Sequence, residues 1–164
     1  MPQLVIIAHN IRSTHNVGSI LRTAEGFGIT RCYLTGYTPY PLLTHDPRLP
    51  HLASKIDAAI SKTALGAEKL VPITQSEDVE SVIRQLKADG HRIVALEQTA
   101  HSVPLSAYTP PEKIALVLGE EVAGINAELL EVCDDAVVIP MQGKKESFNV
   151  SVAAGIAMYA LTLD

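Results

Sequence analysis

Six short apolar runs, most of them separated by stretches with helical periodicity, constrain this chain more than any other feature of its sequence. The runs are almost continuous in Val, Ile and Leu and lie at residues 3–8, 31–36, 69–74, 91–97, 113–119 and 135–140. Strands of this kind are buried on both faces, which is typical of parallel sheets covered by helices. The sequence therefore predicts an α/β fold with a mostly parallel, six-stranded sheet and helices on both faces.

Five helices are predicted, four between these runs and one after the last of them. They lie at residues 16–27, 52–65, 77–88, 126–133 and 149–163. Asn16, Ser76, Asn126 and Asn149 stand at the starts of four of them, and residues of these types cap helix N-termini. Ligands of such folds usually bind at the carboxyl ends of the strands, so we expect functional residues there.

A proline-rich stretch at residues 36–52 interrupts the alternation of strands and helices. It contains four prolines, and proline disfavours both helix interiors and central strands. We expect a long loop there. Such a loop is either a plain surface connection or a functional element, and the sequence leaves both open.

The length of 164 residues is typical of one domain, and we expect a single domain over residues 1–164. Hydrophobic residues make up 47% of the chain, enough for a core that needs no disulfide or metal. Cys32, Cys133 and the six histidines show no metal-ligand spacing, so we expect no metal and a reducing compartment. No apolar run reaches the ~18 residues of a membrane helix, and no signal peptide is apparent. We expect a cytoplasmic protein without membrane contact.

Charge is unevenly divided along the chain, whose net charge is −5. Residues 1–75 carry 7 Lys and Arg against 4 Asp and Glu, whereas residues 76–164 carry 6 against 14. A local basic surface can bind phosphate even when the total charge is negative. The acidic total therefore does not exclude a nucleic-acid partner.

Three polar segments at predicted strand ends do not look like ordinary core. The first is HNIRSTHNVGSILRTAEGFG at residues 9–28, in which Asn16 and Gly18 lie between Arg12 and Arg22. A guanidinium group beside a helix N-terminus forms a phosphate site. A helix cap with a surface ion pair is the alternative, but the density of Asn, Arg and Gly in one turn favours function.

The second segment is LVLGEEVAGI at residues 116–125, where a strand runs into Gly119 and two acids. Glycine permits close approach of the backbone to a ligand at a strand end. The pattern is neither GxGxxG nor a Walker sequence, so it does not support a dinucleotide or triphosphate site. Glu120 and Glu121 are either a solvated turn or acceptors for Arg22 or a ligand hydroxyl, and spacing leaves both open.

The third segment is VVIPMQGKKESFNVSVAAGIAMYAL at residues 137–161. A basic loop with Lys144 and Lys145 precedes Ser147 and Asn149, which lead into a helix of small residues. A helix cap explains one of these two polar residues but not both. No Ser–His–Asp or Cys–His arrangement indicates a catalytic nucleophile.

Together, these segments resemble the SpoU (TrmH) branch of the SPOUT methyltransferases. NVGSILRTAEGFG (16–28), LGEEVAGI (118–125) and IPMQGKKESFNVSVA (139–153) are similar to the three motifs of that family, in the same order. SKTALGAEKLVPI (61–73) is similar to its middle segment. The resemblance therefore covers almost the whole chain, in a short form without an RNA-binding extension.

The resemblance implies a trefoil knot in the C-terminal half, and a homodimer whose interface covers part of each site. It also implies that S-adenosylmethionine binds in the knot and donates a methyl group to a ribose 2′-hydroxyl of tRNA or rRNA. A non-catalytic RNA- or nucleotide-binding module on the same fold is the alternative. The implied cofactor-binding residues are Leu96, Glu97, Leu118, Gly119, Ile139, Met141, Ser147 and Phe148.

The catalytic residues that the resemblance implies are Arg22, Asn16, Glu121, Ser147 and Asn149. Because arginine stays protonated in proteins, we expect Arg22 to hold the 3′-phosphate while that phosphate or water takes the hydroxyl proton. Asn16 would orient Arg22 or the ribose, and Glu121 would steer Arg22 or close the site. The residues expected to contact RNA are Arg12, Arg22, Arg48, Lys144 and Lys145.

Overall fold

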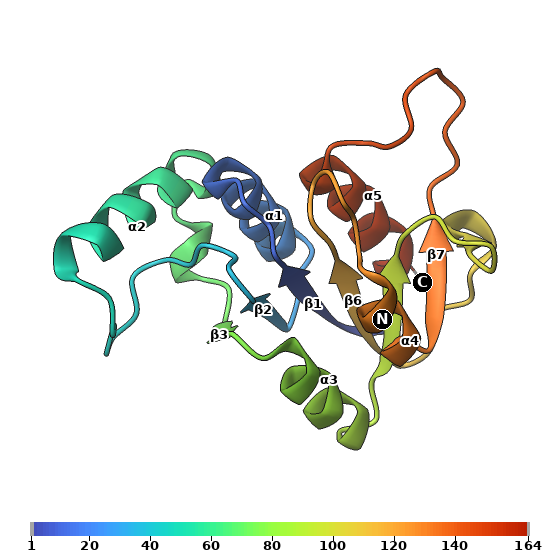
Figure 1. Ribbon diagram of the computed structural model, residues 1–164, viewed down its shortest axis with the longest axis horizontal. Helices are drawn as coiled ribbons and strands as arrows, with labels where there is room; N and C mark the ends of the chain where they lie inside the picture. Colours follow the sequence, from blue (N-terminus) through green and yellow to red (C-terminus); the bar gives the residue numbers. More distant parts are fainter. Residues whose placement is uncertain (1, 164) are drawn as a thin grey trace.

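A computed structural model describes residues 2–163 and shows a parallel sheet between two layers of helices (Figure 1). The sheet has seven strands in the order β3-β2-β1-β6-β4-β7-β5, and every neighbouring pair is parallel. The strands are β1 (Gln3–His9), β2 (Arg31–Thr35), β3 (Ile73–Ser76), β4 (Arg92–Leu96), β5 (Val103–Pro104), β6 (Lys113–Leu118) and β7 (Asp135–Val138).

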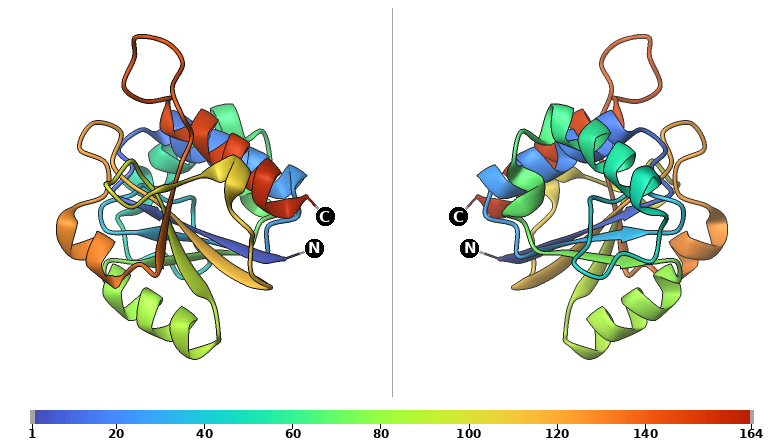
Figure 2. Two further views of the ribbon diagram at one scale, coloured as in Figure 1. Left: turned by 90° about the vertical axis from the view of Figure 1, so that its right-hand side faces the viewer. Right: turned by 90° about the vertical axis from the view of Figure 1, so that its left-hand side faces the viewer.

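Two layers of helices cover the two faces of this sheet (Figure 2). The first layer holds α1, α2 and α5, and the second holds α3 and α4. Short 3-10 helices, η1 and η2, follow α2 and β5. The bounds of all these helices are α1 (Thr14–Gly26), α2 (Pro50–Ala64), η1 (Ala67–Lys69), α3 (Val79–Ala88), η2 (Leu105–Ala107), α4 (Ala127–Val132) and α5 (Val150–Thr162).

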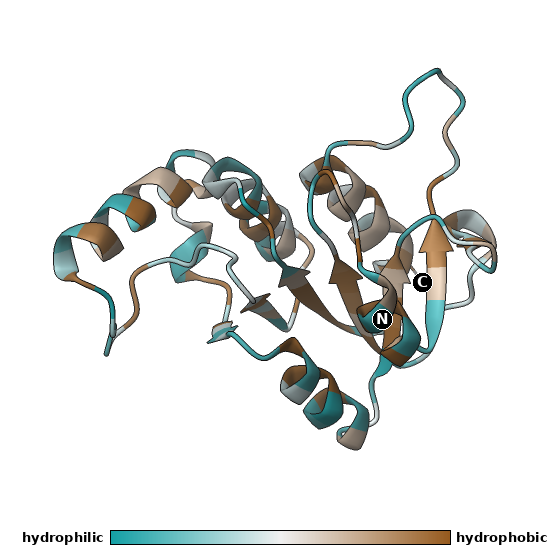
Figure 3. Cartoon of the chain, viewed as in Figure 1, coloured by the Kyte–Doolittle hydropathy of each residue, from teal (hydrophilic) through white to brown (hydrophobic). Residues whose placement is uncertain are grey.

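Strand β1 shows why the apolar runs are continuous. Leu4 and Ile6 point into the cluster under α1 and α5, while Val5 and Ile7 point into the cluster under α3 and α4. Both faces of the strand are therefore buried, and β1 and β6 are hydrophobic along most of their length, whereas β3 and the start of β7 are polar (Figure 3). Each fully buried aliphatic side chain contributes about 1.5–3 kcal/mol.

The structure corrects the prediction of six strands. The seventh strand, β5, has two residues at the sheet edge and is too short to give an apolar run. The predicted strand at 69–74 is also wrong in its bounds, because β3 begins only at Ile73. The chain leaves α2 through two left-handed residues, Leu65 and Gly66, and then forms η1 before it enters the sheet.

The start of α1 also differs from the prediction. Ser13 rather than Asn16 is the N-cap, and the Ser13 hydroxyl accepts a hydrogen bond from the backbone N–H of Asn16 at 3.2 Å. Asn16 therefore lies within the first turn of the helix. Its side chain is left available for contacts outside the helix.

For the other helices, the predicted N-caps are confirmed in two cases and wrong in one. Asn126 and Asn149 cap α4 and α5 as predicted, whereas Asp78 rather than Ser76 caps α3. The proline-rich loop is shorter than predicted, because α2 begins at Pro50. Proline suits the first position of a helix, where its missing N–H has no partner to lose.

Candidate active site

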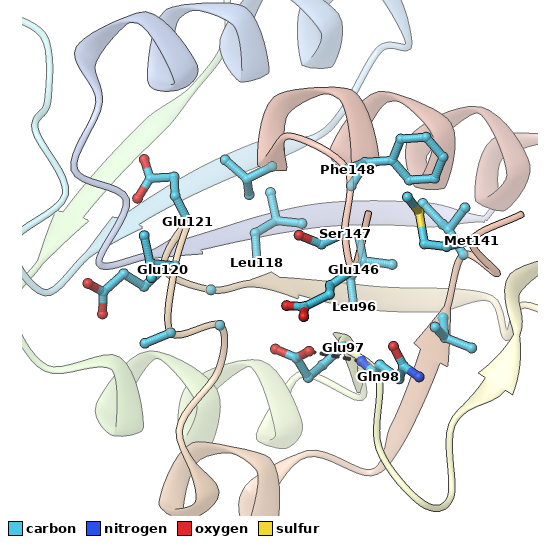
Figure 4. Close-up of a pocket in the computed structure, with 18 residues that line it drawn as sticks. Leu96, Glu97, Gln98, Leu118, Glu120, Glu121, Met141, Glu146, Ser147 and Phe148 are labelled. Carbon is cyan, nitrogen blue, oxygen red and sulfur yellow. Dashed lines mark hydrogen bonds between the residues drawn. The ribbon is translucent and has the colours of Figure 1, made fainter. Parts of the chain in front are cut away.

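A cavity of about 530 Å³ lies at the carboxyl ends of β4, β6 and β7, and its size is in the range of small-molecule sites (Figure 4). Its walls come from the three loops that follow these strands and from the start of α5. Four carboxylates line it and no Lys or Arg does, among the residues that the structure describes. The carboxylates belong to Glu97, Glu120, Glu121 and Glu146.

All eight residues that the resemblance implies for cofactor binding line this one cavity. Leu96, Leu118 and Met141 form part of its apolar wall, and Ser147 and Phe148 lie at the approach to α5 (Figure 4). Their binding role stays a prediction. Eight further residues line the cavity that were not predicted, although most belong to the motifs themselves: Gln98, Val122, Ala123, Gly124, Val138, Glu146, Val150 and Ala153.

Glu121 joins the turn after β6 to the start of α1. Both of its carboxylate oxygens accept from the backbone N–H of Arg12 at 3.1 Å, and Oε1 accepts from Ser13 N–H at 3.1 Å. Oε1 also accepts from Asn16 Nδ2 at 3.2 Å. The Glu121 carboxylate thus satisfies the Arg12 and Ser13 N–H groups at the helix start, where the helix itself supplies no acceptor.

These donors also act on the acidity of the Glu121 side chain. Partial burial by itself would raise its pKa. The N–H groups of Ser13 and Arg12, with the Asn16 amide, outweigh burial and lower the pKa of Glu121 from its ordinary value of 4.5. Glu121 is therefore held as a carboxylate near neutral pH.

Asn149 extends this network to the third motif. Asn149 Nδ2 donates to Asn16 Oδ1 at 3.2 Å, while Asn149 Oδ1 accepts from Ser151 N–H at 2.9 Å as the cap of α5. Asn149, Asn16 and Glu121 thus form one chain of hydrogen bonds. It joins all three motif segments at the rim of the cavity.

Arg22 lies apart from this network within one copy of the chain. It is exposed on α1, and six residues of helix place it about 9 Å along the axis from Asn16. It does not line the cavity, and no hydrogen bond joins it to Glu121 or Asn16 in the described structure. Within a single chain, Glu121 therefore orients Asn16 instead of Arg22.

Three of the residues expected to contact RNA are exposed near the cavity. Lys144 and Lys145 lie on the exposed loop between β7 and α5. The side chain of Arg12 is 71% exposed and pairs with Glu120 at 2.9 Å. The Tyr37 side chain, through a hydrogen bond, and then the charge of Glu120 raise the pKa of Arg12.

Arg48 differs from these three because its guanidinium group is already engaged within its own loop. It donates to Asp46 and to the carbonyl oxygens of Tyr40 and Pro41, and its Cζ lies 3.7 Å from the centre of the Tyr40 ring. Only 16% of its side chain is exposed. The structure therefore places Arg48 as a brace of the proline-rich loop, with few donors left for a phosphate.

Neither a cluster of potential metal ligands nor a helix able to span a membrane is found within residues 2–163. No group of three or more His, Cys, Asp and Glu side chains is placed to hold a metal ion there. No helix in that range is both long and apolar enough to cross a membrane.

Comparison with known sequences places this geometry in context. A model of the SpoU rRNA Methylase family matches residues 3–159. The chain is 31% identical over 156 residues to a tRNA (guanosine(18)-2′-O)-methyltransferase of Aquifex aeolicus, across 95% of this chain and 67% of that protein. It is 33% identical over 160 residues to the 23S rRNA (guanosine-2′-O-)-methyltransferase RlmB of Nitrosomonas europaea, across 96% of this chain and 55% of that protein.

Solved structures show the same similarity. The crystal structure of an AdoMet-bound rRNA methyltransferase from Sinorhizobium meliloti superimposes with a TM-score of 0.80 and 26% identity, over 97% of this chain and 55% of that one. The TrmH/SpoU tRNA modifying enzyme of A. aeolicus gives a TM-score of 0.79 and 26% identity, over 99% and 75%. In these four comparisons, the chain spans between about half and three quarters of the relative's length.

Proposed function

Because the chain belongs to the SpoU rRNA methylase family, we propose that it transfers a methyl group from S-adenosylmethionine to a ribose 2′-hydroxyl of tRNA or rRNA. The observation that carries this proposal is the chain of hydrogen bonds from Asn149 through Asn16 to Glu121. It brings the three motif segments to the rim of one cavity. Relatives named for tRNA and for rRNA support both RNA classes equally.

The cavity suits this cofactor. Its apolar wall fits an adenine ring, and its carboxylates, without any Lys or Arg beside them among the described residues, attract a positively charged ligand. When bound, S-adenosylmethionine supplies an already activated methyl group. The tasks left to the chain are alignment of the acceptor and removal of its proton.

The hydrogen-bonded chain holds its side chains in place before RNA arrives. We propose that Asn16 and Asn149 orient the target ribose, and that Ser147, exposed on the cavity wall, holds the target nucleotide or the cofactor. Arg22 remains protonated and holds the 3′-phosphate, while that phosphate or water accepts the hydroxyl proton. Arg12, Lys144 and Lys145 supply further phosphate contacts.

We also propose a homodimer. An exposed apolar stripe runs along α5 to its C-cap. The side chains of this stripe are 37–55% exposed, and they are Val152, Ile156, Tyr159 and Leu163. Phe27, which follows α1, extends it, with its ring centre 6.2 Å from that of Tyr159. A second copy that covers this stripe would let Arg22 of one copy serve the cavity of the other. The trefoil knot and a cytoplasmic location remain expectations, the latter supported by the free thiols of Cys32 and Cys133.

The deciding experiment uses purified protein, methyl-labelled S-adenosylmethionine and unmodified tRNA and rRNA pools. The RNA is digested to nucleosides, and label on a 2′-O-methylated nucleoside confirms the activity and names the RNA class. Cofactor binding without label in either pool would favour the non-catalytic binding module. Loss of both would contradict the proposal.

Arg22→Ala tests the proposed role of the arginine. Loss of the contact to phosphate should lower turnover by at least about 100-fold, while S-adenosylmethionine still binds, because Arg22 lies outside the cavity. Arg84→Ala, an exposed arginine on α3, is the matched control and should keep its turnover. Near-normal turnover of Arg22→Ala would remove Arg22 from the mechanism.

A further inference from the structure

We propose that Glu97 is a positioning residue that latches the turn after β6 against the end of β4, and so maintains the shape of the cavity. The turn comprises residues 120–124, all of which line the cavity. The inference rests on the proposed function, because it concerns how that site is held in shape for its cofactor. Part of its test is independent of the cofactor.

Glu97 is firmly anchored in the sheet. It follows the last residue of β4, and its backbone N–H donates to the carbonyl oxygen of Val137 in β7 at 3.0 Å. Its carboxylate receives two backbone N–H groups, Gln98 on Oε1 and Ile125 on Oε2, each at 2.9 Å. The first of these bonds is drawn in Figure 4. Hydrogen bonds to a charged acceptor are roughly twice as strong as neutral ones.

Glycine at position 124 leaves the space that this contact needs. Gly124 has φ +70°, and a Cβ built there would lie only 2.2 Å from Glu97 Oε2. On the other side of the turn, a Cβ at Gly119 would lie 2.5 Å from the carbonyl carbon of Gly124. The carboxylate, the turn and the end of β6 therefore pack at backbone distance, with no room for a side chain between them.

On its other side, the turn is held against the start of α1, where Glu121 accepts its hydrogen bonds and Glu120 pairs with Arg12 at 2.9 Å. Its own bonds are a reciprocal pair, Glu120 N–H to Gly124 O at 3.1 Å and Gly124 N–H to Glu120 O at 2.9 Å. Val122 at its tip is 92% exposed and contributes no core packing. Two carboxylates therefore fix it at its two ends, Glu121 against the start of α1 and Glu97 against the end of β4.

These bonds distinguish Glu97 from a residue whose only role is to bind a ligand. Each Glu97 oxygen already accepts a backbone N–H, and one of these donors, Ile125, directly follows the turn. Losing the Ile125 bond removes the anchor between the turn and β4, while Glu121 and Glu120 still hold the turn against the start of α1. We therefore expect the loss to weaken cofactor binding more than the rate of methyl transfer at saturating cofactor.

The first test is Glu97→Gln, which places an NH2 group against one of the two N–H donors. In the cofactor-free protein, hydrogen exchange of the Ile125 amide should become about tenfold faster. The Kd for S-adenosylmethionine should rise by about tenfold, with turnover at saturating cofactor within a factor of about three. Glu128→Gln makes the same charge change at an exposed position of α4 and should alter none of these.

The second test is a double-mutant cycle that combines Gly124→Ala with Glu97→Ala. In the unaltered background, the new Cβ meets the Glu97 carboxylate, whereas in the Glu97→Ala background that obstruction is gone and only the backbone strain at φ +70° remains. Gly124→Ala should therefore weaken cofactor binding at least about fivefold less in the Glu97→Ala background. Equal effects in both backgrounds would show that Glu97 and Gly124 act independently, and the latch would be wrong.

These outcomes distinguish failure of the latch from failure of the proposed function. If the unaltered protein does not bind S-adenosylmethionine, the proposed function fails, yet amide exchange at Ile125 still decides whether Glu97 holds the turn. If Glu97→Gln leaves that exchange rate unchanged, the latch is overturned whatever the cofactor does.

Discussion

The sequence predicts that Asn16 both caps α1 and takes part in the site, but Ser13 provides the cap and Asn16 the contacts in the site. Both can cap a helix, and the cap falls to Ser13, which accepts from Asn16 N–H. The Asn16 amide is thereby left to bridge Glu121 and Asn149, residues that lie 105 and 133 positions away in the chain. A shift of three residues in the helix start therefore changes an ordinary cap into a member of the site.

Glu121→Ala tests the contribution of this network to stability. Because hydrogen bonds lower the folded-state pKa of Glu121, folding favours its charged form, and the stabilisation is present above pH 4.5. It is lost as the pH falls through the lowered folded-state pKa. We expect Glu121→Ala to reduce the free energy of unfolding by about 1 kcal/mol at neutral pH, after allowance for solvent screening.

Denaturant unfolding over a pH series checks this expectation. The difference in the free energy of unfolding between the unaltered protein and Glu121→Ala should shrink as the solution is acidified below pH 4.5. Glu128→Ala, at an exposed site on α4, should show no such trend. A difference that grows on acidification would contradict the assignment.

At the scale of elements, the close packing of α1 on α2 rests on Gly18. A Cβ at Gly18 would lie 2.1 Å from Thr63 Oγ1 and 2.3 Å from the Ile60 carbonyl oxygen. The two helix backbones approach each other there without a side chain between them. In addition, Thr63 Oγ1 donates to the carbonyl oxygen of His15 at 2.8 Å. The first turn of α1, which carries Asn16, is thus held by α2 from outside the site.

Gly18→Ala should therefore destabilise the protein by about 3 kcal/mol, because the obstructing atoms include backbone that cannot move away. Gly26→Ala is a matched control in the same helix, where a Cβ meets nothing within 4 Å. That change should be neutral or should stabilise by about 0.5 kcal/mol. Chemical denaturation of both variants measures the two values, and equal effects would contradict the close packing.

At the scale of the whole molecule, negative and positive groups are separated. The cavity is lined by carboxylates, while Lys144, Lys145 and Arg22 are exposed outside it. A phosphate would be repelled from the cavity itself, so its contacts must come from the rim or from another copy. This separation supports the proposed homodimer, in which Arg22 reaches the cavity of the neighbouring copy.

Mixing Arg22→Ala with Glu121→Ala, each altered at a proposed catalytic residue, tests that arrangement. Arg22→Ala retains a cavity and Glu121→Ala retains the arginine, so a mixed dimer has one complete site. After equal co-expression, roughly a quarter of the sites should be complete, and methyl transfer should return in proportion. Activity that stays at the level of either variant alone would place both residues in the same copy.

Much of the architecture could be predicted because its signals are local. Apolar runs marked five of the strands to within a few residues, and polar residues at their ends marked the segments that meet at the cavity. β5 was missed, since two edge residues carry no periodic pattern. Arg48 was assigned to RNA from its charge alone, and only the folded loop shows that Asp46 and two carbonyl oxygens already engage it.

The sequence by itself determined the order of strands and helices, the membership of the three motif segments and the family resemblance. Each of these depends on local sequence patterns, namely side-chain periodicity and turn chemistry. Only the tertiary structure decided which of those residues touch. Because β6 lies between β1 and β4, the turn after it meets α1 through Glu121 on one side and β4 through Glu97 on the other. Strand order depends on how whole elements pack, and no local pattern carries it.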